Sequence, residues 1–520
     1  MEESTIDTVD RISQLPDSII HHVLSFLSDR PKTLVRVSVL SKNWYSLTAS
    51  LPILKFDWLR LSGNFFKYVK YTTSRLSEQN TSLHKLDIDA IIREPAHGDI
   101  IDKCVRLVLQ KGVQVLVLEV AYRKGQQMYH LPTQLLFASS LLSLKLCNCE
   151  LPSTLMVYTR MFTSLKLLSL KNVPIDGEVM TYLIDSCPVL EELKIKHCDG
   201  FNRICVNAHQ TLQKVQIRIP VPIDRIDIAA PNLRYLLVDG NIRKPTLMNL
   251  ASCEKLKTFC YFGHLSEPNF VDLLSSLRFI QNLFLCSSRD KWRLSIPSLR
   301  SLALQSDCDL DEIDINAPNL LLFDYSGCGS CRGQKYLSTP FKKEDSVRPT
   351  KFMRINTLFF HVDAIWFQKL RFFLGKYQGI EVLKLHIGVN EDGINVNELM
   401  GINSPPYELK HLHVAFYDLQ DFEDVVDALL WCCRPLSLTL RLEAHCMWLK
   451  NQRLHRLKHP YEKLLKQEDR GLFDIRFVLT HVSEAKQHFT DLNSLVEAIH
   501  RDEHPSTITF IKERVIEEAG

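Results

Sequence analysis

Hydrophobic residues near the start of the chain follow a helical pattern. In the first run they recur at steps of three and four residues, the spacing of one helix face: Ile19, Ile20, Val23, Leu24 and Leu27. The sequence Leu15-Pro16-Asp17 suits a helix start, and residues 28–31 are expected to end the helix. A second helical run follows, with apolar positions Leu34, Val35, Val37, Leu40 and Trp44. About 45 residues cannot bury enough surface to be robust alone, so this segment is expected to pack on the rest of the chain or on a partner.

Most of the remaining chain repeats one phrase, apolar-x-x-apolar-x-apolar. Clear copies end at Leu146, Leu170, Ile195, Ile217, Val238, Tyr261, Leu285, Leu304 and Tyr325. Weaker or later copies end at Ile88, Leu118, Phe360, Leu385 and Val414. Clear copies are about 19–25 residues apart, in or near the range of leucine-rich repeats. A set of unrelated α/β strands is the alternative, but few regular helical patterns separate the later copies.

The last two apolar positions of each phrase flank one residue and therefore point the same way on a short strand. The residue between them points outward and is usually polar or charged, as in Lys145, Ser169, Lys194 and Gln216. Stacking such strands gives a parallel sheet with one core face and one solvent face. Cys149 and Cys198 suit the turn after the phrase, and residues 176–188 form a connecting helix that stops at a proline.

The N-terminal stretch resembles an F-box. Leu15-Pro16 and the apolar positions after it fit the first F-box helix, residues 39–44 fit the second-half signature of plant F-box proteins, and residues 51–57 fit the exit strand. Asn43 departs from the pattern, because family members usually carry arginine there. The resemblance implies docking on the Skp-type adaptor of an SCF (Skp–cullin–F-box) ubiquitin ligase, through these residues: Leu15, Pro16, Ile19, Ile20, Val23, Leu24, Phe26, Leu27, Leu40 and Trp44. An ordinary amphipathic helical hairpin is the alternative.

A second phrase extends the resemblance to plant F-box/leucine-rich-repeat proteins over about residues 10–440. Residues 226–233 and 313–320 are near-copies that end in Ala-Pro-Asn-Leu, each predicting a strand on the convex side before a proline turn. The expected fold is α/β: a helical F-box at 11–58, an irregular leucine-rich-repeat solenoid at 80–445 with a parallel sheet, and a small α/β C-terminal cap or FBD-like region at 446–520. Residues 327–350 widen the spacing and predict an insertion loop.

The C-terminal region changes character. We expect a helix at 422–431, a strand at 436–442, a strand at 473–479, a helix at 492–499 and a last strand at 508–511. Between them lies a basic stretch containing Arg453, Arg456, Lys458, Lys463 and Lys466. Acidic residues dilute its charge, so a solvated helix and loop face is favoured over a nuclear-import signal or polyanion patch.

Composition mainly argues against certain classes of protein, namely nucleic-acid-binding, membrane-spanning and secreted proteins. The 520 residues carry a formal net charge of +3, which gives no argument for nucleic acid or a membrane surface. No apolar run of 18 residues predicts a transmembrane helix, and the polar N-terminus is unlike a signal peptide. The 15 scattered cysteines indicate reduced thiols in a cytoplasmic and/or nuclear protein. Outward Lys145, Lys171, Lys194, Lys196 and Arg234 give the repeats a faint basic character, which favours an acidic partner weakly.

No motif for catalysis or metal binding is present. The search finds no GxSxG, GxxxxGK[ST], GxGxxG after a strand, or HExxH. Cys328 and Cys331 form a CxxC, but a zinc site usually needs a second such pair, and none has the right spacing. His197 beside Cys198 is interpreted as a turn residue rather than a base. We therefore expect no cofactor, no metal and no enzyme activity in this chain.

The resemblance implies a substrate-recognition subunit of an SCF-type ubiquitin ligase. The N-terminal helices are expected to bind the adaptor, and through it a cullin, while the repeats bind a target protein that the sequence does not identify. A non-degradative protein-binding adaptor is the main alternative. A co-receptor whose repeat face holds a small molecule is a third hypothesis, for which the sequence offers no pocket-forming motif.

Overall fold

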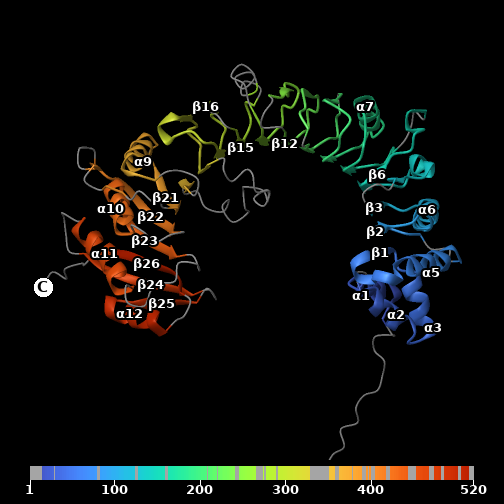
Figure 1. The fold of residues 1–520 in the computed structure, drawn as a ribbon, viewed down its shortest axis with the longest axis horizontal. Coiled ribbons are helices and arrows are strands. Elements are labelled where there is room, and N and C mark those ends of the chain that lie inside the picture. Colours follow the sequence, from blue (N-terminus) through green and yellow to red (C-terminus); the bar gives the residue numbers. More distant parts are fainter. Residues whose placement is uncertain are drawn as a thin grey trace, which may run out of the picture. The chain divides into compact units, whose positions relative to one another are not determined.

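The chain forms two compact units in the computed structural model, residues 1–256 and 257–520, each of which is described by itself (Figure 1). The structure describes residues 15–27, 30–78, 82–122, 127–157, 162–207, 209–219, 221–240, 245–264, 273, 277–287, 291–327, 351–357, 362–377, 379–388, 394–395, 398–399, 405–416, 422–442, 453–467, 473–481, 485–501 and 505–514. Among these, no helix is both long and apolar enough to cross a bilayer.

The N-terminal unit begins with three short helices. Helix α1 (Asp17–Ser25) starts after Pro16, as the sequence predicts. The second predicted run is in fact two helices, α2 (Pro31–Ser38) and α3 (Lys42–Ala49), so the prediction of one run was wrong. Pro31 occupies the first turn of α2, where its missing N–H costs nothing. Ser41 separates the two helices, and its side chain accepts a hydrogen bond from the Trp44 backbone N–H at 3.2 Å.

A parallel sheet follows in the order β1–β2–β3–β5–β7–β8–β10–β12. Its strands are β1 (Ile53–Asp57), β2 (Lys85–Ile92), β3 (Val115–Tyr122), β5 (Ser143–Cys147), β7 (Leu167–Lys171), β8 (Glu192–Lys196), β10 (Lys214–Arg218) and β12 (Tyr235–Asp239). Corresponding positions of the repeated phrase pair with one another: Leu144 with Leu168, and Leu168 with Leu193. The predicted exit strand is β1, which is also the first strand of this sheet.

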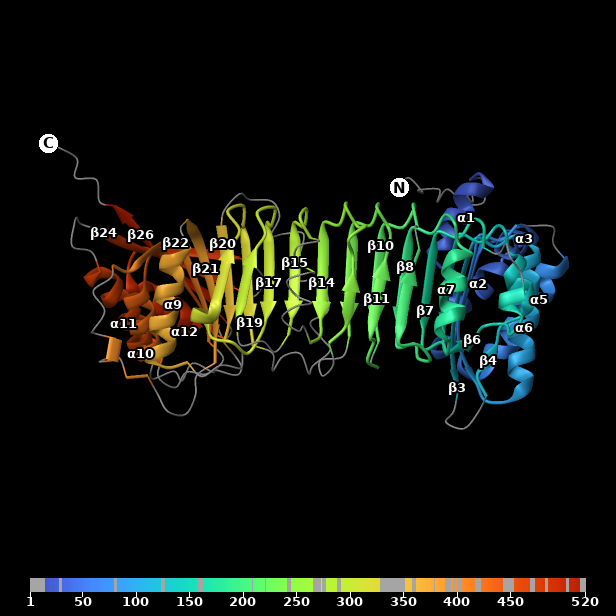
Figure 2. The ribbon, with the colours of Figure 1, turned by 90° about the horizontal axis from the view of Figure 1, so that it is seen from above.

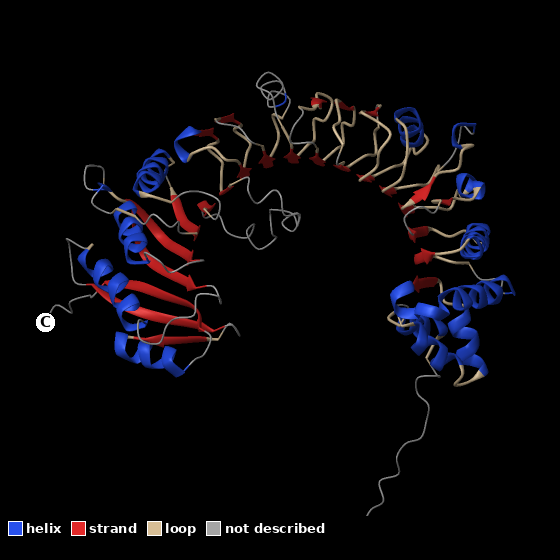
Figure 3. Cartoon of the chain, in the orientation of Figure 1, coloured by secondary structure: helices blue, strands red, loops and turns tan. Residues whose placement is uncertain are grey.

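Helices and small sheets cover the core face of this unit (Figure 3). The helices are α4 (Trp58–Leu61), α5 (Phe65–Glu78), α6 (Pro95–Gln110) and α7 (Gly177–Asp185). Three 3-10 turns, Ser62–Asn64, Thr133–Phe137 and Leu155–Val157, complete the connections. The small sheets are β4 (Tyr129–His130) with β6 (Cys149–Glu150), and β9 (Arg203–Val206), β11 (Arg225–Ile228) and β13 (Leu247–Asn249). Helix α7 and strand β11 match the sequence prediction.

The turns after β5, β7 and β8 share a left-handed backbone. Asn148, Asn172 and His197 have φ of 55°, 50° and 51°, a region that asparagine tolerates better than most residues. The Asn172 side-chain amide donates to Asn148 Oδ1 at 2.9 Å, which links consecutive turns. Cys149 and Cys198 are buried beside these turns, as predicted, and each thiol lies near the carbonyl oxygen two residues earlier. The interpretation of His197 as a turn residue is confirmed.

The C-terminal unit continues the same construction. Its parallel strands are β14 (Thr258–Phe262), β15 (Asn282–Cys286), β17 (Ser301–Gln305), β19 (Leu322–Ser326), β20 (Lys351–Asn356), β21 (Ile380–Ile387), β22 (Tyr407–Phe416) and β23 (Cys433–Leu442), paired in that order. Strand β18 (Ile313–Asn316) is the second predicted convex strand, and it pairs with β16 (Trp292–Ser295). A 3-10 turn spans Leu310–Glu312. In Figure 2 the strands within each unit run side by side.

Two details of this unit differ from the sequence prediction. The copy of the phrase assigned to Ile355, Leu358 and Phe360 was shifted, because β20 ends at Asn356 and its buried pair is Met353 and Ile355. Helix α9 (Ala364–Lys376) also separates β20 from β21, so a long helix does occur between late strands. The predicted insertion loop, with Cys328 and Cys331, lies outside the described residues.

The C-terminal region extends the sheet with antiparallel strands. Strand β26 (Pro505–Arg514) pairs with β23 and with β24 (Phe473–His481), and β24 pairs with β25 (Lys486–Phe489). Helices α10 (Phe422–Cys432), α11 (Arg453–Lys466) and α12 (Leu492–Arg501) complete it. The basic stretch is helix α11, and part of it is not simply solvated: His459 and Lys463 both contact Asp427 on α10, at 2.8 Å and 2.5 Å.

Arg75 on helix α5 links that helix to α3. From α5 its guanidinium lies 4.1 Å from the centre of the Tyr45 ring and 5.4 Å from that of Tyr71, and it donates to the Tyr45 carbonyl oxygen at 3.0 Å. Cation–π contacts of this kind contribute about 0.5–1 kcal/mol, and a hydrogen bond from a charged donor contributes about 1.5–3 kcal/mol.

Replacing Arg75 by alanine is therefore expected to lower the free energy of unfolding of the N-terminal unit by about 1–3 kcal/mol. Denaturant unfolding, followed by tryptophan fluorescence, measures this change. The matched control is Lys70→Ala on the exposed side of the same helix, which is expected to stay within about 0.5 kcal/mol of wild type. Equal effects of the two substitutions would contradict the role of Arg75.

Candidate protein-binding surfaces

Helix α1 is apolar on two faces. Its inner face carries Ile20 and Leu24, each only 1% exposed, which form a core with Leu47 and Leu51. Residues that pack against this core while keeping some exposed area are Leu27, Leu34, Val37 and Trp44. This core holds the three helices together within the chain itself.

The outer face of α1 and the residues just before and after it form a row, which we call the outer row: Leu15, Ile19, Val23 and Phe26. These side chains are 40%, 47%, 45% and 70% exposed. Spacings of four, four and three residues place them on one side of a helix, above one another. A soluble helix rarely leaves such a row uncovered, so the row is suited to packing against another protein.

A second exposed apolar group lies at the turn between α2 and α3. Val39 and Leu40 are 76% and 69% exposed, and Val35 on α2 is also exposed. The break at Ser41 turns Val39 and Leu40 away from the core, whereas a single continuous helix would have placed them differently. Val35 and Val39 were not among the predicted adaptor contacts. Their signal was present in the sequence, since Val35 is an apolar position of the second helical run and Val39 precedes the predicted contact Leu40, but the helix break was not recognised.

The predicted adaptor contacts therefore divide by burial. Those at the surface are Leu15, Pro16, Ile19, Val23, Phe26 and Leu40. Leu27 and Trp44 are partly buried against the internal core. Ile20 and Leu24 are buried inside the chain, so in this structure they support the surface from behind rather than form part of it. Helical periodicity alone groups all apolar residues of α1 and does not separate its two faces.

The sheet of the N-terminal unit offers a broader surface. Alternate residues of each strand are buried, and the others point away from the core, as in β8, where Leu193 and Ile195 are buried and Lys194 and Lys196 are partly exposed. We call the side bearing the latter the open face. No described helix covers it (Figure 3). Lys145, Lys171, Lys194 and Lys196 lie on this face, as predicted. Arg234 precedes β12 and is not part of the face.

The C-terminal unit has a histidine on the corresponding face. His413 lies on β22, paired in register with Lys384 on β21. Burial, with smaller contributions from the charges of Lys384 and His411, lowers the pKa of His413 to about 4. The side chain is therefore neutral at pH 7, and protonating it in the folded state is unfavourable.

This pKa predicts acid sensitivity of the C-terminal unit. Because the folded-state pKa lies below the ordinary value of 6.5, the unfolded chain binds more protons between pH 6.5 and 4. The stability contributed by neutral His413 is complete above about pH 6.5 and is lost as the pH falls toward 4. We expect His413→Gln to lose less stability than wild type between pH 7 and 4.5 in thermal unfolding. Parallel pH profiles for the two proteins would contradict the assignment.

The described residues offer little for catalysis. They contain no group of three or more potential metal ligands. Burial raises the pKa of the Cys187 and Cys433 thiols to about 12, which keeps them protonated and unreactive near neutral pH. A cavity of about 220 Å³ lies beside β18, β19 and α9, lined by Phe323, Phe373 and Tyr377 among others. It is smaller than the roughly 300–1,000 Å³ of sites for drug-sized ligands.

Comparison with known proteins identifies similar chains. The F-box domain family model matches residues 12–56. A second family model, described as "FBD-associated F-box protein At5g56370, LRR repeats", matches residues 101–321. These two matches cover the outer row with the helices behind it, and most of the N-terminal unit's sheet.

Three relatives from Arabidopsis thaliana illustrate the similarity. F-box/LRR-repeat protein 25 is 28% identical over 44% of this chain and 84% of its own length. F-box/FBD/LRR-repeat protein At1g13570 is 26% identical over 60% of this chain and 75% of its own length. Putative F-box/LRR-repeat protein At5g02930 is 27% identical over 47% of this chain, and the chain spans about half of that relative's length.

Proposed function

Because this chain belongs to the plant F-box/leucine-rich-repeat proteins, we propose that it is the substrate-recognition subunit of an SCF-type ubiquitin ligase. The outer row of α1 docks on a Skp-type adaptor, and the adaptor connects the chain to a cullin. The repeat sheet binds a target protein. The observation that carries the proposal is the exposed apolar row at the point where the F-box model matches.

The two halves of this function follow from the two surfaces. An amphipathic helix with exposed apolar anchors is a standard element of protein recognition, and those anchors contribute most of the binding energy in such contacts. A stacked parallel sheet presents a long row of side chains from many repeats, which suits a protein target. The proposed catalytic contribution is proximity, because holding a target near a charged conjugating enzyme raises its effective concentration.

The chain is in this proposal a non-catalytic subunit. The ubiquitin thioester chemistry takes place on other chains of the ligase, and this chain needs no cofactor or metal. Its site of action is the cytoplasm, the nucleus or both, in agreement with the number of cysteine thiols that it carries without a disulfide among the described residues.

The proposal is tested by reconstitution with a purified adaptor, cullin complex and conjugating enzyme. Proteins that the full chain retains are added as substrates, and ubiquitin conjugates are followed on gels. We expect conjugation of at least one retained protein, and its loss when Ile19 and Phe26 are both replaced. Assembly with the cullin but no conjugation of any retained protein would favour the alternative, a non-degradative adaptor that recruits its partners without modifying them.

A further inference from the structure

Charges on the open face of the N-terminal unit are segregated along the sheet. The strands β1, β2 and β3 present four acidic side chains, Asp57, Asp87, Asp89 and Glu119, and two basic ones, Lys55 and Lys85. The next four strands, β5, β7, β8 and β10, present one acidic side chain, Glu192, and six basic ones: Lys145, Lys171, Lys194, Lys196, Lys214 and Arg218. One end of the face is therefore acidic and the other basic.

The segregation is clearest along one line across the sheet. Register pairs one outward position of each neighbouring strand in a continuous row, which we call the charge row: Asp57, Asp89, Glu119, Cys147, Lys171, Lys196, Arg218 and Asp239. Three acidic residues come first, then a cysteine, then three basic residues, and Asp239 closes the row. Neighbouring strands are about 4.8 Å apart, so like charges accumulate within a short distance.

Some of these charges are already neutralised within the chain. Lys171 Nζ lies 3.0 Å from Glu119 Oε1, which joins the two halves across Cys147. Glu192 Oε1 forms ion pairs with both Lys194 Nζ and Lys214 Nζ, each at 2.9 Å. Asp57 lies 3.3 Å from Arg60, and Asp87 lies 2.9 Å from Lys85. These pairs account for much of the face but leave specific members of the charge row without an ion pair.

Lys196 and Arg218 are the basic members left over. Neither has an ion pair among the described residues, and the Nε of Arg218 is buried without a hydrogen-bond acceptor. Burial and the nearby charges of Arg218, Lys194 and Lys171 lower the pKa of Lys196. Asp239 is paired in register with Arg218. The described residues show no ion pair between the two, although the charge of Arg218 lowers the pKa of Asp239 against the larger effect of burial, which raises it. An anion placed over Lys196 and Arg218 would relieve the repulsion between these two positive charges.

Asp89 is the acidic member of the charge row on strands β1–β3 that has no ion pair among the described residues. Burial, with the charges of Glu119, Asp57 and Asp87, raises its pKa. It lies four strand steps from Lys196, which corresponds to about 19 Å along the sheet. A positive charge from a bound partner placed over Asp89 would reduce the repulsion among these carboxylates. An anion over Lys196 and Arg218 would reduce the repulsion among the positive charges in the same way.

We propose that this face binds an acidic segment of the target protein, with Asp or Glu carboxylates over Lys196 and Arg218 and basic residues about 20 Å away over Asp89. This inference rests on the proposed function, because it specifies the chemistry of the target that the repeats select. A nucleic acid fits poorly, because its uniform negative charge would meet the acidic strands β1–β3 on the same face. The segregated charges also fix the direction in which the segment lies.

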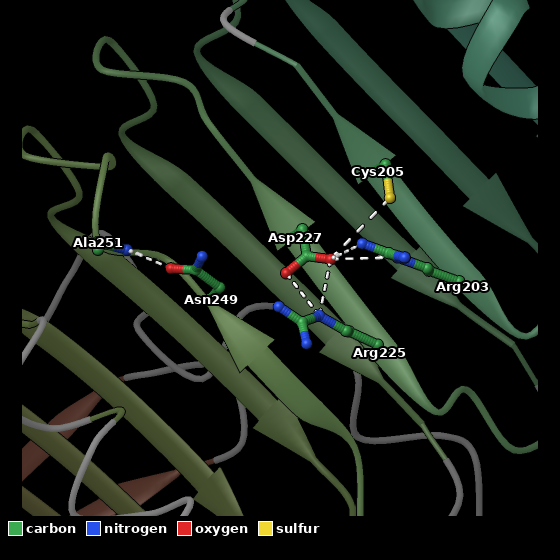
Figure 4. Close-up of polar contacts among 6 residues, drawn as sticks. All are labelled: Arg203, Cys205, Arg225, Asp227, Asn249 and Ala251. Atoms are coloured by element: carbon green, nitrogen blue, oxygen red, sulfur yellow. Dashed lines mark hydrogen bonds and ion pairs between the residues drawn. The ribbon is translucent and has the colours of Figure 1, made fainter.

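The chain provides a matched control on the opposite side of the same unit. Figure 4 shows Arg203 on β9 and Arg225 on β11 converging on Asp227. Arg203 lies 2.9 Å from Asp227 Oδ2, and Arg225 Nε also lies 2.9 Å from that atom. Replacing these two arginines removes the same charge from the unit as replacing Lys196 and Arg218, but away from the open face.

The test uses the full chain and a fluorescein-labelled peptide with eight consecutive glutamates, measured by fluorescence anisotropy at moderate salt. We expect Lys196→Gln with Arg218→Gln to weaken peptide binding about tenfold or more, and Arg203→Gln with Arg225→Gln to change it less than about twofold. Lys145→Gln, an exposed substitution that leaves the core intact, is expected to weaken binding by a smaller factor. A peptide with eight serines is expected not to bind.

Three results would overturn the inference: no binding of the glutamate peptide to wild type, equal weakening by the two double variants, or tighter binding of a single-stranded RNA than of the glutamate peptide. Adaptor binding is measured on the same samples. If the peptide result fails while the adaptor still binds, the target chemistry is wrong and the proposed function stands. If the adaptor does not bind wild type, the proposed function fails whatever the peptide does.

Discussion

Replacing both Ile19 and Phe26 by serine is expected to weaken binding of the Skp-type adaptor about 100-fold or more while leaving the chain folded. Both side chains lie in the outer row, where they are 47% and 70% exposed. Truncating a central apolar anchor in a protein interface typically costs about 2 kcal/mol or more, and each 1.4 kcal/mol is a factor of ten in affinity. The effect on folding is expected to stay within about 0.5 kcal/mol, because neither residue belongs to the internal core.

Calorimetric titration of the purified adaptor into the wild-type and variant chains measures this effect. The control is Leu59→Ser, which removes an even more exposed leucine, at 83%, from helix α4 outside the outer row. This control should bind the adaptor with wild-type affinity. If the Leu59 variant loses as much affinity as the double variant, general surface hydrophobicity and not the outer row would explain binding.

Replacing Leu24 by alanine is expected to unfold the N-terminal helices themselves, whereas the Ile19 and Phe26 substitutions leave the chain folded. Leu24 is 1% exposed and packs in the four-residue core with Ile20, Leu47 and Leu51. A buried Leu→Ala substitution costs about 2–5 kcal/mol, and three helices of this size have little stability to lose. Adaptor binding is lost as a consequence, since the outer row depends on the helix that carries it.

Val23→Ala is the matched control, because Val23 is the neighbour of Leu24 on the same helix but is 45% exposed. It is expected to leave hydrogen exchange of α1 and α3 close to wild type, whereas Leu24→Ala should accelerate exchange throughout both helices. Protected amides in the Leu24 variant would show that the four-residue core does not hold the helices together.

Much of the repeat architecture is predictable because the apolar positions of the phrase follow the alternation of side chains along a strand. Leu144, Leu168 and Leu193 occupy the same position in successive copies of the phrase, and they are also the residues that pair across neighbouring strands. The strands could therefore be located from the periodicity of the sequence. The convex strands β11 and β18 were likewise predictable from their alternating isoleucines. The shift at β20 arose because a copy of the phrase that ends on the buried pair Met353 and Ile355 would have to begin at residue 350, which is a polar threonine.

The surfaces were harder to predict than the strands. Ile19 and Ile20 are adjacent and chemically identical, yet one is exposed and the other buried, because Leu47 and Leu51 reach only one side of α1. The break at Ser41 depends on one weak interaction, the hydrogen bond from the Trp44 backbone N–H to the Ser41 side chain. The apolar pattern around it is also compatible with one continuous helix. The charge row joins residues separated by 21 to 32 positions in each step, and Arg218 enters it only through register. No local signal in the sequence identifies such a row.

Strand β1 makes a deletion of residues 1–57 unsuitable for testing the role of the N-terminal helices. Deleting residues 1–57 would remove β1 as well, including Phe56, which is 1% exposed and packs near Tyr68 at 5.8 Å between ring centres. It would leave the edge of β2 unpaired. After such a deletion, loss of adaptor binding could not be separated from damage to the sheet. Point substitutions on the surface are therefore required.

The most direct test of the ligase function is a pull-down of the full chain and of its Leu15→Asp, Pro16→Ala variant, both probed for the adaptor and the cullin. Leu15 and Pro16 are exposed at the start of α1, so the variant should fold. Wild type is expected to retain both proteins and the variant to retain neither, while other bound proteins remain. Retention of the adaptor by the variant, or its absence from wild type, would contradict it.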